Sequence, residues 1–325
     1  ASGTTIRGLA IGGFSNQGGA ISVTGANQSI IGCNRIGTNA AGTLALPNGN
    51  GVLLNSVQGV QVASNLISGN ANAAVVLFQA VNNVISGNLI GTDITGVNPV
   101  PNAKGVVLPN IPGFSASYGN TISGNTIAYN DAGPAQGYRI LVQSPGNRIT
   151  RNSIHDNAGT VPPPAINGGL GINSSVGSGN FSRAETLSNG MVQVRLNTGA
   201  GYAAAGTILT FEVFSSPTCD PSGSGEGRTF ITSLSVTADS SGRAIVKGSV
   251  PGAGLPIGPV PLGEVLTATL TNEANGTTGG FTRCAVPGLA VTSVAPAGAV
   301  NVDGSVPVSI AGSGFAAGMT LAFSL

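Results

Sequence analysis

The sequence has little charge and few aromatic side chains. Of its 325 residues, 7% are charged, 4% are aromatic and none is tryptophan. Its 12 basic and 11 acidic residues leave a formal net charge of +1, so no strongly basic surface is available to attract nucleic acid or an anionic membrane. No run of about 20 apolar residues is present, which argues against a transmembrane helix. We therefore expect neither nucleic acid nor membrane insertion.

What the sequence does have is a repeat. Residues 120–130 read N-x-I-x-G-N-x-I-x-x-N, and the pattern recurs with substitutions through the first half. Successive copies lie 25, 31, 23, 37 and 27 residues apart. A recurring pattern with such a period is typical of a solenoid, because one short unit cannot bury its own apolar face. The middle asparagine marks each copy: Leu9 in the weakest, then Asn34, Asn65, Asn88, Asn125 and Asn152.

Each copy predicts one coil of parallel β-structure. Apolar residues three before and two after the marker, such as Ile122 and Ile127, should point into one core from both sides of a turn. We expect the marker asparagine to take left-handed backbone angles there and to hydrogen-bond its equivalents in adjacent coils, forming an asparagine ladder. Runs such as 106–108 supply the remaining strands. A helical repeat is disfavoured by 52 glycines and the lack of a 3.6-residue period.

Two loops between the repeats match each other. Segments 36–54 and 90–108 share their landmarks at an offset of 54 residues, so the same excursion should leave the same edge on alternate coils. The pair is either a binding ridge or a duplicated unit whose loops are merely tolerated.

The second half has a different period. From about Glu185 the sequence alternates between apolar and polar residues, in short runs separated by turn residues, which predicts a β-sandwich. From Gly288 a third pattern begins. We predict a solenoid at 1–182, a sandwich at 183–287, and a partial domain or strand-donating tail at 288–325.

The three cysteines differ in context. Cys33 adjoins a marker asparagine, where a small buried thiol is expected. Cys219 and Cys284 lie in the second half at the ends of predicted strands, and we predict that they form a disulfide, which implies an oxidising, extracytoplasmic location. Asp220 and Glu226 could bind calcium, although the adjacent turn residues explain this segment more simply. No other cofactor is predicted, and the first residues already fit the repeat, so Ala1 should lie inside a longer precursor.

The solenoid offers little for catalysis. Its acidic residues, Asp93, Asp131 and Asp156, do not occupy equivalent positions in neighbouring coils, so no carboxylate pair for hydrolysis and no acidic metal cluster is predicted. One coil carries a group that should face solvent and could contact a sugar carboxylate, although an ordinary surface pair is the simpler interpretation. This candidate ligand face comprises Arg148, Arg151, His155 and Asp156, with Arg139 nearby; the aromatic candidates for sugar stacking are Tyr118, Tyr129 and Tyr138.

These motifs resemble those of known proteins. Blocks such as 120–130, followed by Gly-Val-x-Leu, resemble secreted bacterial proteins of the right-handed parallel β-helix class over about residues 1–180. The segments 211–214, 219–227, 266–269 and 281–284 resemble the sandwich that often follows such β-helices on bacterial surfaces. The last 38 residues are similar to the first half of an immunoglobulin-like IPT/TIG domain. The resemblance implies an all-β fold: a right-handed parallel β-helix, an immunoglobulin-like β-sandwich and a partial second sandwich.

The resemblance implies an exported protein but not a reaction, because the β-helix hosts pectin-degrading enzymes, phage tailspikes and adhesins. We expect a non-enzymatic protein of the bacterial cell surface, a filament or layer subunit or an adhesive stalk. It would self-associate by end-to-end stacking or by C-terminal strand donation. The alternatives are a polysaccharide lyase or hydrolase that uses the candidate ligand face, and a glycan-binding module.

Overall fold

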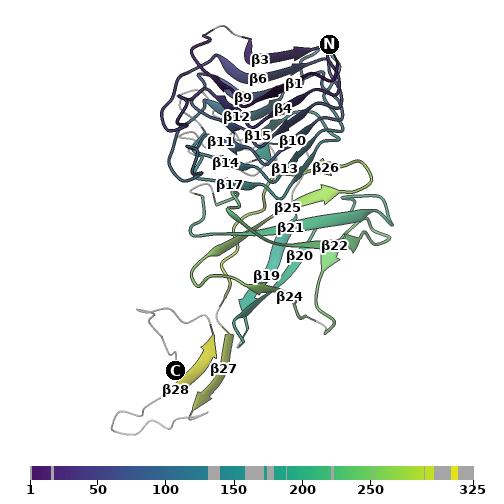
Figure 1. Ribbon diagram of the computed structural model, residues 1–325. Helices are drawn as coiled ribbons and strands as arrows, with labels where there is room; N and C mark the ends of the chain where they lie inside the picture. Colours follow the sequence, from purple (N-terminus) through teal and green to yellow (C-terminus); the bar gives the residue numbers. More distant parts are fainter. Residues whose placement is uncertain are drawn as a thin grey trace.

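The computed structural model consists of strands and connecting loops. It describes residues 2–15, 18–130, 140–157, 172–173, 179–187, 189–220, 223–250, 252–288, 290–295 and 309–313. Six stacked coils form a parallel β-helix, and antiparallel sheets follow it (Figure 1). The predicted all-β fold, a parallel β-helix followed by antiparallel structure, is confirmed. Across the described ranges, no helix is long and apolar enough to cross a membrane.

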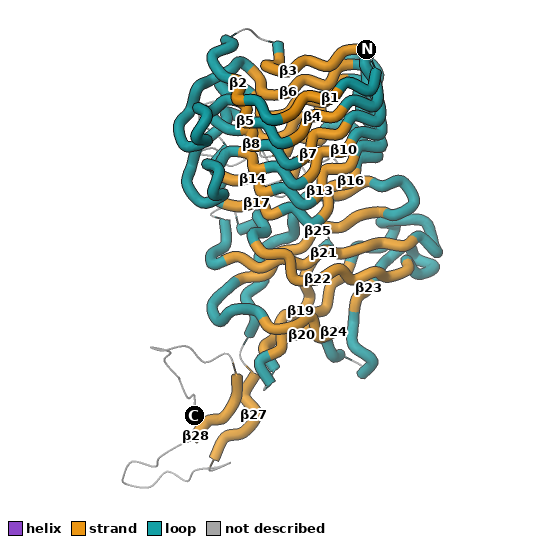
Figure 2. Tube along the Cα trace, in the orientation of Figure 1, coloured by secondary structure: helices purple, strands orange, loops and turns teal. Residues whose placement is uncertain are grey.

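Each coil contributes one strand to each of three parallel sheets (Figure 2). Sheet 1 contains β1 (Thr5–Arg7), β4 (Ile30–Gly32), β7 (Gln61–Ala63), β10 (Val84–Ser86), β13 (Thr121–Ser123) and β16 (Arg148–Thr150). Sheet 2 contains β2 (Ala10–Ile11), β5 (Arg35–Ile36), β8 (Leu66–Ile67), β11 (Leu89–Ile90), β14 (Thr126–Ala128) and β17 (Ser153–His155). Sheet 3 contains β3 (Gly19–Thr24), β6 (Asn50–Asn55), β9 (Ala73–Phe78), β12 (Lys104–Leu108), β15 (Ile140–Val142) and β18 (Ile172–Asn173).

The core of the β-helix consists of aliphatic side chains stacked in register. Ile85 pairs with Ile122, and Ile122 with Ile149, along sheet 1. Ile122 and Ile127, on the two sides of the marker Asn125, are fully buried as predicted. Parallel pairing therefore places like residues above one another, and each apolar strand is covered by its neighbours.

Asparagines at all three corners of the coil form ladders. In the predicted ladder, Asn88 Nδ2 donates to Asn125 Oδ1 at 2.9 Å and Asn125 Nδ2 donates to Asn152 Oδ1 at 2.9 Å. Two further ladders lie at the other corners and were not predicted. One contains Asn48, Asn70, Asn102, Asn130 and Asn157, and the other Asn83, Asn120 and Asn147.

The backbone geometry of the corners differs from the prediction. The left-handed residue is the one before each marker, for example Cys33 with φ 55° and Arg151 with φ 51°, and not the asparagine itself. This leaves the asparagine side chain directed inward along the ladder. It also corrects the prediction for Cys33, whose thiol is exposed rather than buried because its corner position turns outward.

The second half of the chain forms antiparallel sheets. Sheet 4 contains β19 (Asn180–Thr186), β20 (Met191–Asn197), β23 (Ile245–Val246) and β24 (Leu255–Pro259). Sheet 5 contains β22 (Thr229–Thr237), β21 (Ile208–Ser216), β25 (Val265–Asn272) and β26 (Thr277–Thr278), and its inner face shares a core with sheet 4. A two-stranded sheet pairs β27 (Ala290–Ala295) with β28 (Ser309–Ser313).

Cys219 and Cys284 form the predicted disulfide. This bond places the chain in an oxidising, extracytoplasmic compartment. The domain boundaries at residues 182 and 287 stay predictions, as do the immunoglobulin-like and IPT/TIG assignments. Most of the predicted partial domain at 288–325 lies outside the described residues.

The hydrophobic core of the β-helix extends into the antiparallel half. Phe214 and Phe281, from the antiparallel half, are buried and belong to the same apolar cluster as the β-helix isoleucines. Their rings meet edge-on with centroids 5.5 Å apart. The bottom of the coil stack is thus closed by aromatic side chains, and burial of this apolar area favours a fixed arrangement of the halves.

Candidate functional site

The four residues of the candidate ligand face lie in the sixth coil, where it meets the antiparallel half. Sheets 1 and 2 end there with strands β16 and β17. The structure does bring the four residues onto one coil, as predicted. Each of them, however, contacts side chains from the antiparallel half or from the coil itself, so their surroundings must be described one at a time.

Arg148 forms an ion pair across the junction. Its guanidinium makes two hydrogen bonds to the carboxylate of Glu273, one of them with Nη1 3.2 Å from Oε1. The hydrogen bonds lower the pKa of Glu273 and raise that of Arg148. A bidentate pair of this kind is among the stronger charge-assisted contacts. Arg148 is therefore occupied by a residue 125 positions away.

Arg151 is held in a different way. Its guanidinium carbon lies 5.4 Å from the ring centroid of Phe230, a cation–π contact. Its backbone N–H donates to Glu212 Oε2 at 2.8 Å, and Glu212 also accepts from the Thr150 hydroxyl. Glu212 is buried, so these bonds satisfy a carboxylate that would otherwise be costly to bury.

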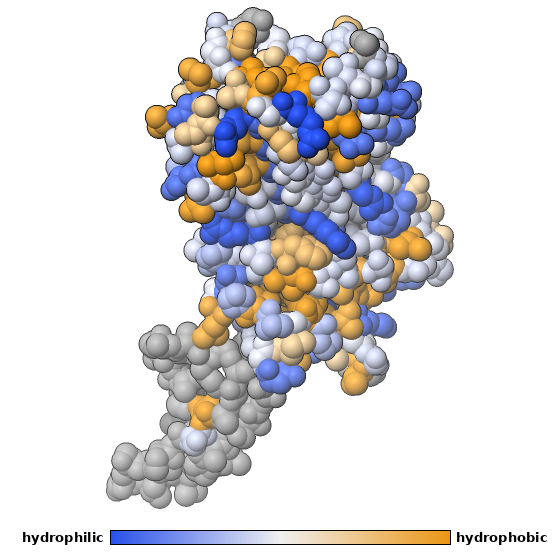
Figure 3. Space-filling model, in the orientation of Figure 1, coloured by the Kyte–Doolittle hydropathy of each residue, from blue (hydrophilic) through white to orange (hydrophobic). Residues whose placement is uncertain are grey.

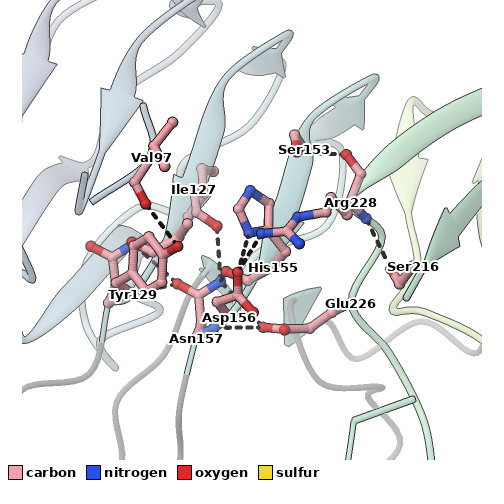
Figure 4. Close-up of polar contacts among 12 residues, drawn as sticks. Val97, Ile127, Tyr129, Ser153, His155, Asp156, Asn157, Ser216, Glu226 and Arg228 are labelled. Carbon is pink, nitrogen blue, oxygen red and sulfur yellow. Dashed lines mark hydrogen bonds and ion pairs between the residues drawn. The ribbon is translucent and has the colours of Figure 1, made fainter. Parts of the chain in front are cut away.

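His155 does not face solvent, which corrects the sequence-based expectation. The residue is only 9% exposed, because its ring packs edge-on against Tyr129 and its Nδ1 lies 2.8 Å from Asp156 Oδ2. Burial lowers the pKa of His155, and the neighbouring Asp156 opposes this shift only in part. Asp156 lies between His155 and Arg228, whose Nη2 is 2.6 Å from the same Oδ2 (Figure 4).

Glu226 ends one of the asparagine ladders. Its Oε1 accepts from both the backbone N and the Nδ2 of Asn157, each at 3.2 Å. Figure 4 shows this carboxylate beside Asn157 and below Asp156. The calcium-binding prediction for Asp220 and Glu226 gains no support, because no group of three metal-ligating acidic, histidine or cysteine side chains occurs in the described part of the chain. The Asp220 carbonyl accepts a hydrogen bond from the N–H of Gly223 at 2.8 Å.

Backbone groups of the sixth coil also form hydrogen bonds with the antiparallel half. Ile154 and Gly227 exchange two hydrogen bonds of 2.8 Å, as in a strand pair. The hydroxyls of Thr277 and Thr278 accept from Gly146 N at 2.8 Å and Ile149 N at 3.0 Å. Donors that a seventh coil would satisfy thus find acceptors in the antiparallel half, as a buried strand edge requires.

The matched loops stack against each other. Each is closed by a β-bridge, Thr38 with Ala45 and Thr92 with Pro99, and Ile94 N donates to Gly42 O at 2.9 Å. Exposed apolar side chains lie along them, and Figure 3 shows hydrophobic residues at the upper left, over the loops beside β2 and β5. They are Leu44, Leu46, Ile94 and Val97. The loops therefore lie together at one edge of the β-helix, as the matching sequences predicted, and a binding role for them stays a prediction.

The remaining candidate residues are explained by local structure or fall outside the description. Asp93 accepts hydrogen bonds from Thr95 and Asn98 within its own loop, which hold its pKa well below the usual range. Tyr129 donates its hydroxyl to Val97 O, and Tyr118 is exposed. Asp131, Tyr138 and Arg139 lie outside the described residues. Within the described ranges the acidic residues of the β-helix are thus engaged in structural contacts.

The junction residues that sequence reasoning missed come from the antiparallel half. Glu212, Glu226, Arg228 and Glu273 lie 61 to 125 residues from their partners in the sixth coil. No local sequence pattern pairs them with the coil. The one available signal is that a charged residue in a chain with 7% charged residues is a candidate for a specific contact. Chemically, the arrangement joins and closes two structural units. The carboxylates of Asp156, Glu212, Glu226 and Glu273 all accept hydrogen bonds from other residues of the junction.

Comparison with known proteins finds one family model that matches part of the chain. Residues 12–167 match the family model described as "Periplasmic copper-binding protein (NosD)", which is most of the β-helix and just under half of the chain. No curated protein matches the sequence. Among solved structures, the full-length tailspike protein 2 from Escherichia coli O157:H7 bacteriophage CAB120 is similar with 13% identity and a TM-score of 0.18. The match covers 89% of this chain and 60% of the tailspike, and a likeness so low carries no argument about function.

Proposed function

We propose that this chain is a non-enzymatic structural protein of the bacterial cell surface, in which the β-helix and the antiparallel half form one rigid stalk. The proposal is carried by the junction. Several of the few charged side chains lie where the two halves meet. Arg148 pairs with Glu273, Asp156 pairs with Arg228, Glu212 accepts from the N–H of Arg151, and Glu226 caps Asn157. Charged side chains held in such contacts are engaged within the protein, and removal of one partner would leave the other unpaired at a cost to stability.

The matched family name makes copper a candidate ligand, but the donor residues do not fit. Copper in proteins is held by imidazole nitrogens and by thiolate or thioether sulfurs. The sequence has one histidine, and two of its three cysteines form the disulfide. His155 is buried against Tyr129 and Asp156, while Cys33 is exposed at a corner with a lone thiol. The proposal therefore assigns no metal step to this chain.

The filament form of the proposal is less well supported than the stalk. End-to-end stacking needs free strand edges at both ends of the β-helix. The antiparallel half already pairs with the last strands of sheets 1 and 2, through Ile149, Arg151 and Ile154. Self-association through the first coil or by donation of the C-terminal strands stays a prediction, as does a polysaccharide partner.

The rival proposal is a polysaccharide lyase or hydrolase acting through Arg148, Arg151, His155 and Asp156.

One experiment separates the two proposals. The intact chain is imaged by electron microscopy at low concentration and, in parallel, incubated with acidic and neutral polysaccharides. We expect separate particles with one fixed angle between rod and head, and no release of reducing or unsaturated ends. A broad spread of angles would contradict the rigid stalk. Turnover that is lost in Arg151→Ala would establish the enzyme instead.

A further inference from the structure

The outer face of sheet 4 carries an unusual group of cations. Arg183 on β19 pairs directly with Arg195 on β20 in the antiparallel register. Along β20, Val194 and Leu196 are fully buried, so Arg195 between them points outward. Like charges directly opposite one another destabilise a sheet. A chain with only 12 basic residues has therefore placed two where they repel, and a ligand that binds both would offset this cost.

A pocket lies at this point. Its volume is about 470 Å³, within the range of small-molecule sites. A third cation, Arg243, reaches it from the segment before β23, and polar side chains complete much of its wall. The lining residues used here are Ser182, Arg183, Arg195, Asn197 and Arg243.

The charges in and around the pocket are incompletely balanced. Arg183 Nε lies 2.7 Å from Glu185 Oε1, and Arg243 Nε lies 3.7 Å from Asp239 Oδ2. Asp239 is itself engaged by the N–H and hydroxyl of Ser241. Across the described residues, the guanidinium of Arg195 makes no ion pair or hydrogen bond. Three guanidinium groups thus face two carboxylates, and the central one, on Arg195, is free to bind an anion.

We propose that this pocket binds the oxyanion of a hydroxylated, sugar-sized ligand, with Arg195 as the principal contact. The planar fork of an arginine matches a carboxylate or a phosphate in two parallel hydrogen bonds, and both groups share this chemistry. The amide of Asn197 can donate to or accept from ligand hydroxyls, and Ser182 Oγ, which donates to Arg195 O at 3.2 Å, can accept from one. The site lies on the antiparallel half and does not depend on the function proposed for the junction.

Binding is tested on the intact chain by isothermal titration calorimetry with three probes. They are inorganic phosphate, a trimer of galacturonic acid, and a trimer of galactose as the neutral control. We expect phosphate or the acidic trimer to bind more tightly than the neutral trimer, and the affinity to fall as salt is raised. Binding of phosphate alone identifies a free oxyanion, and binding of the acidic trimer alone identifies a sugar carboxylate.

Substitutions of Arg195 then test its role as the principal contact. Arg195→Gln should weaken binding at least tenfold, and Arg195→Lys should weaken it less, because it keeps the charge but loses the fork. The matched control is Arg283→Gln, an exposed arginine of the same half that does not line the pocket. Without ligand, Arg195→Gln should unfold at the same or a higher temperature than the wild type, since it removes a repulsion from Arg183.

Three results would overturn the proposal. They are equal binding by the wild type and Arg195→Gln, equal binding of the acidic and neutral trimers without binding of phosphate, and no binding of any probe at millimolar concentration. If Arg195→Gln fails to fold, the Arg195→Lys comparison carries the test. An equal loss of binding in Arg283→Gln would show that the effect is one of general charge, which also counts against the pocket.

Discussion

Glu226 takes the place of the next asparagine beneath Asn157. Its Oε1 lies 3.2 Å from both the backbone N and the Nδ2 of Asn157. One coil earlier, Asn157 Oδ1 accepts from the same two donors of Asn130, at 2.9 and 3.1 Å. A carboxylate oxygen from the antiparallel half thus repeats the geometry of an amide oxygen within the ladder. Glu226 therefore acts as the last acceptor of this asparagine ladder.

This relationship predicts a difference between two substitutions. Glu226→Ala removes an acceptor from the backbone N–H of the buried Asn157, while Asn157 Nδ2 keeps its hydrogen bonds to Ile127 O and His155 O. This loss should lower the free energy of unfolding by about 1 to 3 kcal/mol. Glu226→Gln keeps an amide oxygen in place and should lie close to the wild type. Denaturant unfolding measures both, and equal losses in the two variants would show that the charge of Glu226, not its acceptor oxygen, matters.

The disulfide should stabilise the segment that bears Glu226. It joins Cys219 to Cys284 over a sequence separation of 65 residues, for which chain entropy predicts a contribution of about 4 kcal/mol. The double variant Cys219→Ser, Cys284→Ser should unfold at a lower denaturant concentration, and its sixth coil should exchange amide hydrogens faster. Addition of a reductant to the wild type should have the same effect. Cys33→Ser is the matched control, because Cys33 is exposed and forms no disulfide, and its one side-chain contact, from Arg7 Nη2 at 3.7 Å, can be kept by a serine hydroxyl. This variant should leave stability unchanged.

The interior of a ladder should be sensitive to substitution. Asn88 donates to Val62 O and Asn125 Oδ1, and it accepts from two nitrogens of Asn65. Replacement of Asn88 by alanine leaves several of these buried groups unsatisfied and should cost at least about 2 kcal/mol. Asn55→Ala loses one exposed contact to the Ser56 hydroxyl and should cost less than about 0.5 kcal/mol. If thermal unfolding shows a similar loss of stability in Asn88→Ala and Asn55→Ala, the ladder contributes little to the stability of the β-helix.

The buried His155 predicts how stability depends on pH. Its folded pKa lies below the ordinary value of 6.5, because burial disfavours the charged ring. The unfolded chain then binds more protons, so this contribution to stability is complete above about pH 6.5 and declines as the pH falls below it. Glu273 affects stability at lower pH, since its folded pKa lies below 4.5. Its contribution to the free energy of unfolding is lost as the pH falls through that folded pKa.

A variant isolates the histidine. Between pH 5 and pH 7, the midpoint of urea unfolding of the wild type should rise with pH, whereas His155→Gln should show a smaller slope. An identical slope in the variant would assign the dependence to other groups. The comparison stays above pH 4.5, the ordinary pKa of Glu273, so Glu273 contributes little to the slope, and its contribution is common to both proteins.

The coils can be predicted well from the sequence because the residues that define each corner lie within a few positions of one another. The spacing around Asn125 places Ile122 and Ile127 on one core, and the structure buries both. The two additional ladders were visible in the same pattern, since residues 120, 125 and 130 are asparagines five residues apart and mark three corners. The exposed Cys33 was predicted wrongly because the left-handed corner residue is the one before the marker.

The junction was not predictable in the same way. Arg148 and Glu273 are 125 residues apart, and only the folded antiparallel half brings them together. Arg228 likewise reaches Asp156, beside His155, from 72 residues away. Pairings of this kind depend on how two separate folds meet, and no period in the sequence encodes that.

The most direct test of the capped, rigid stalk is the exchange rate of single amide hydrogens in the sixth coil. The N–H groups of Arg151 and Ile154 have their acceptors in the antiparallel half, at Glu212 and Gly227. In the intact wild-type chain we predict exchange as slow as that of interior coils, for example at Leu89, whose N–H bonds Asn65 O. Exchange of Arg151 and Ile154 at the rate of an open strand edge, while Leu89 stays protected, would contradict the account.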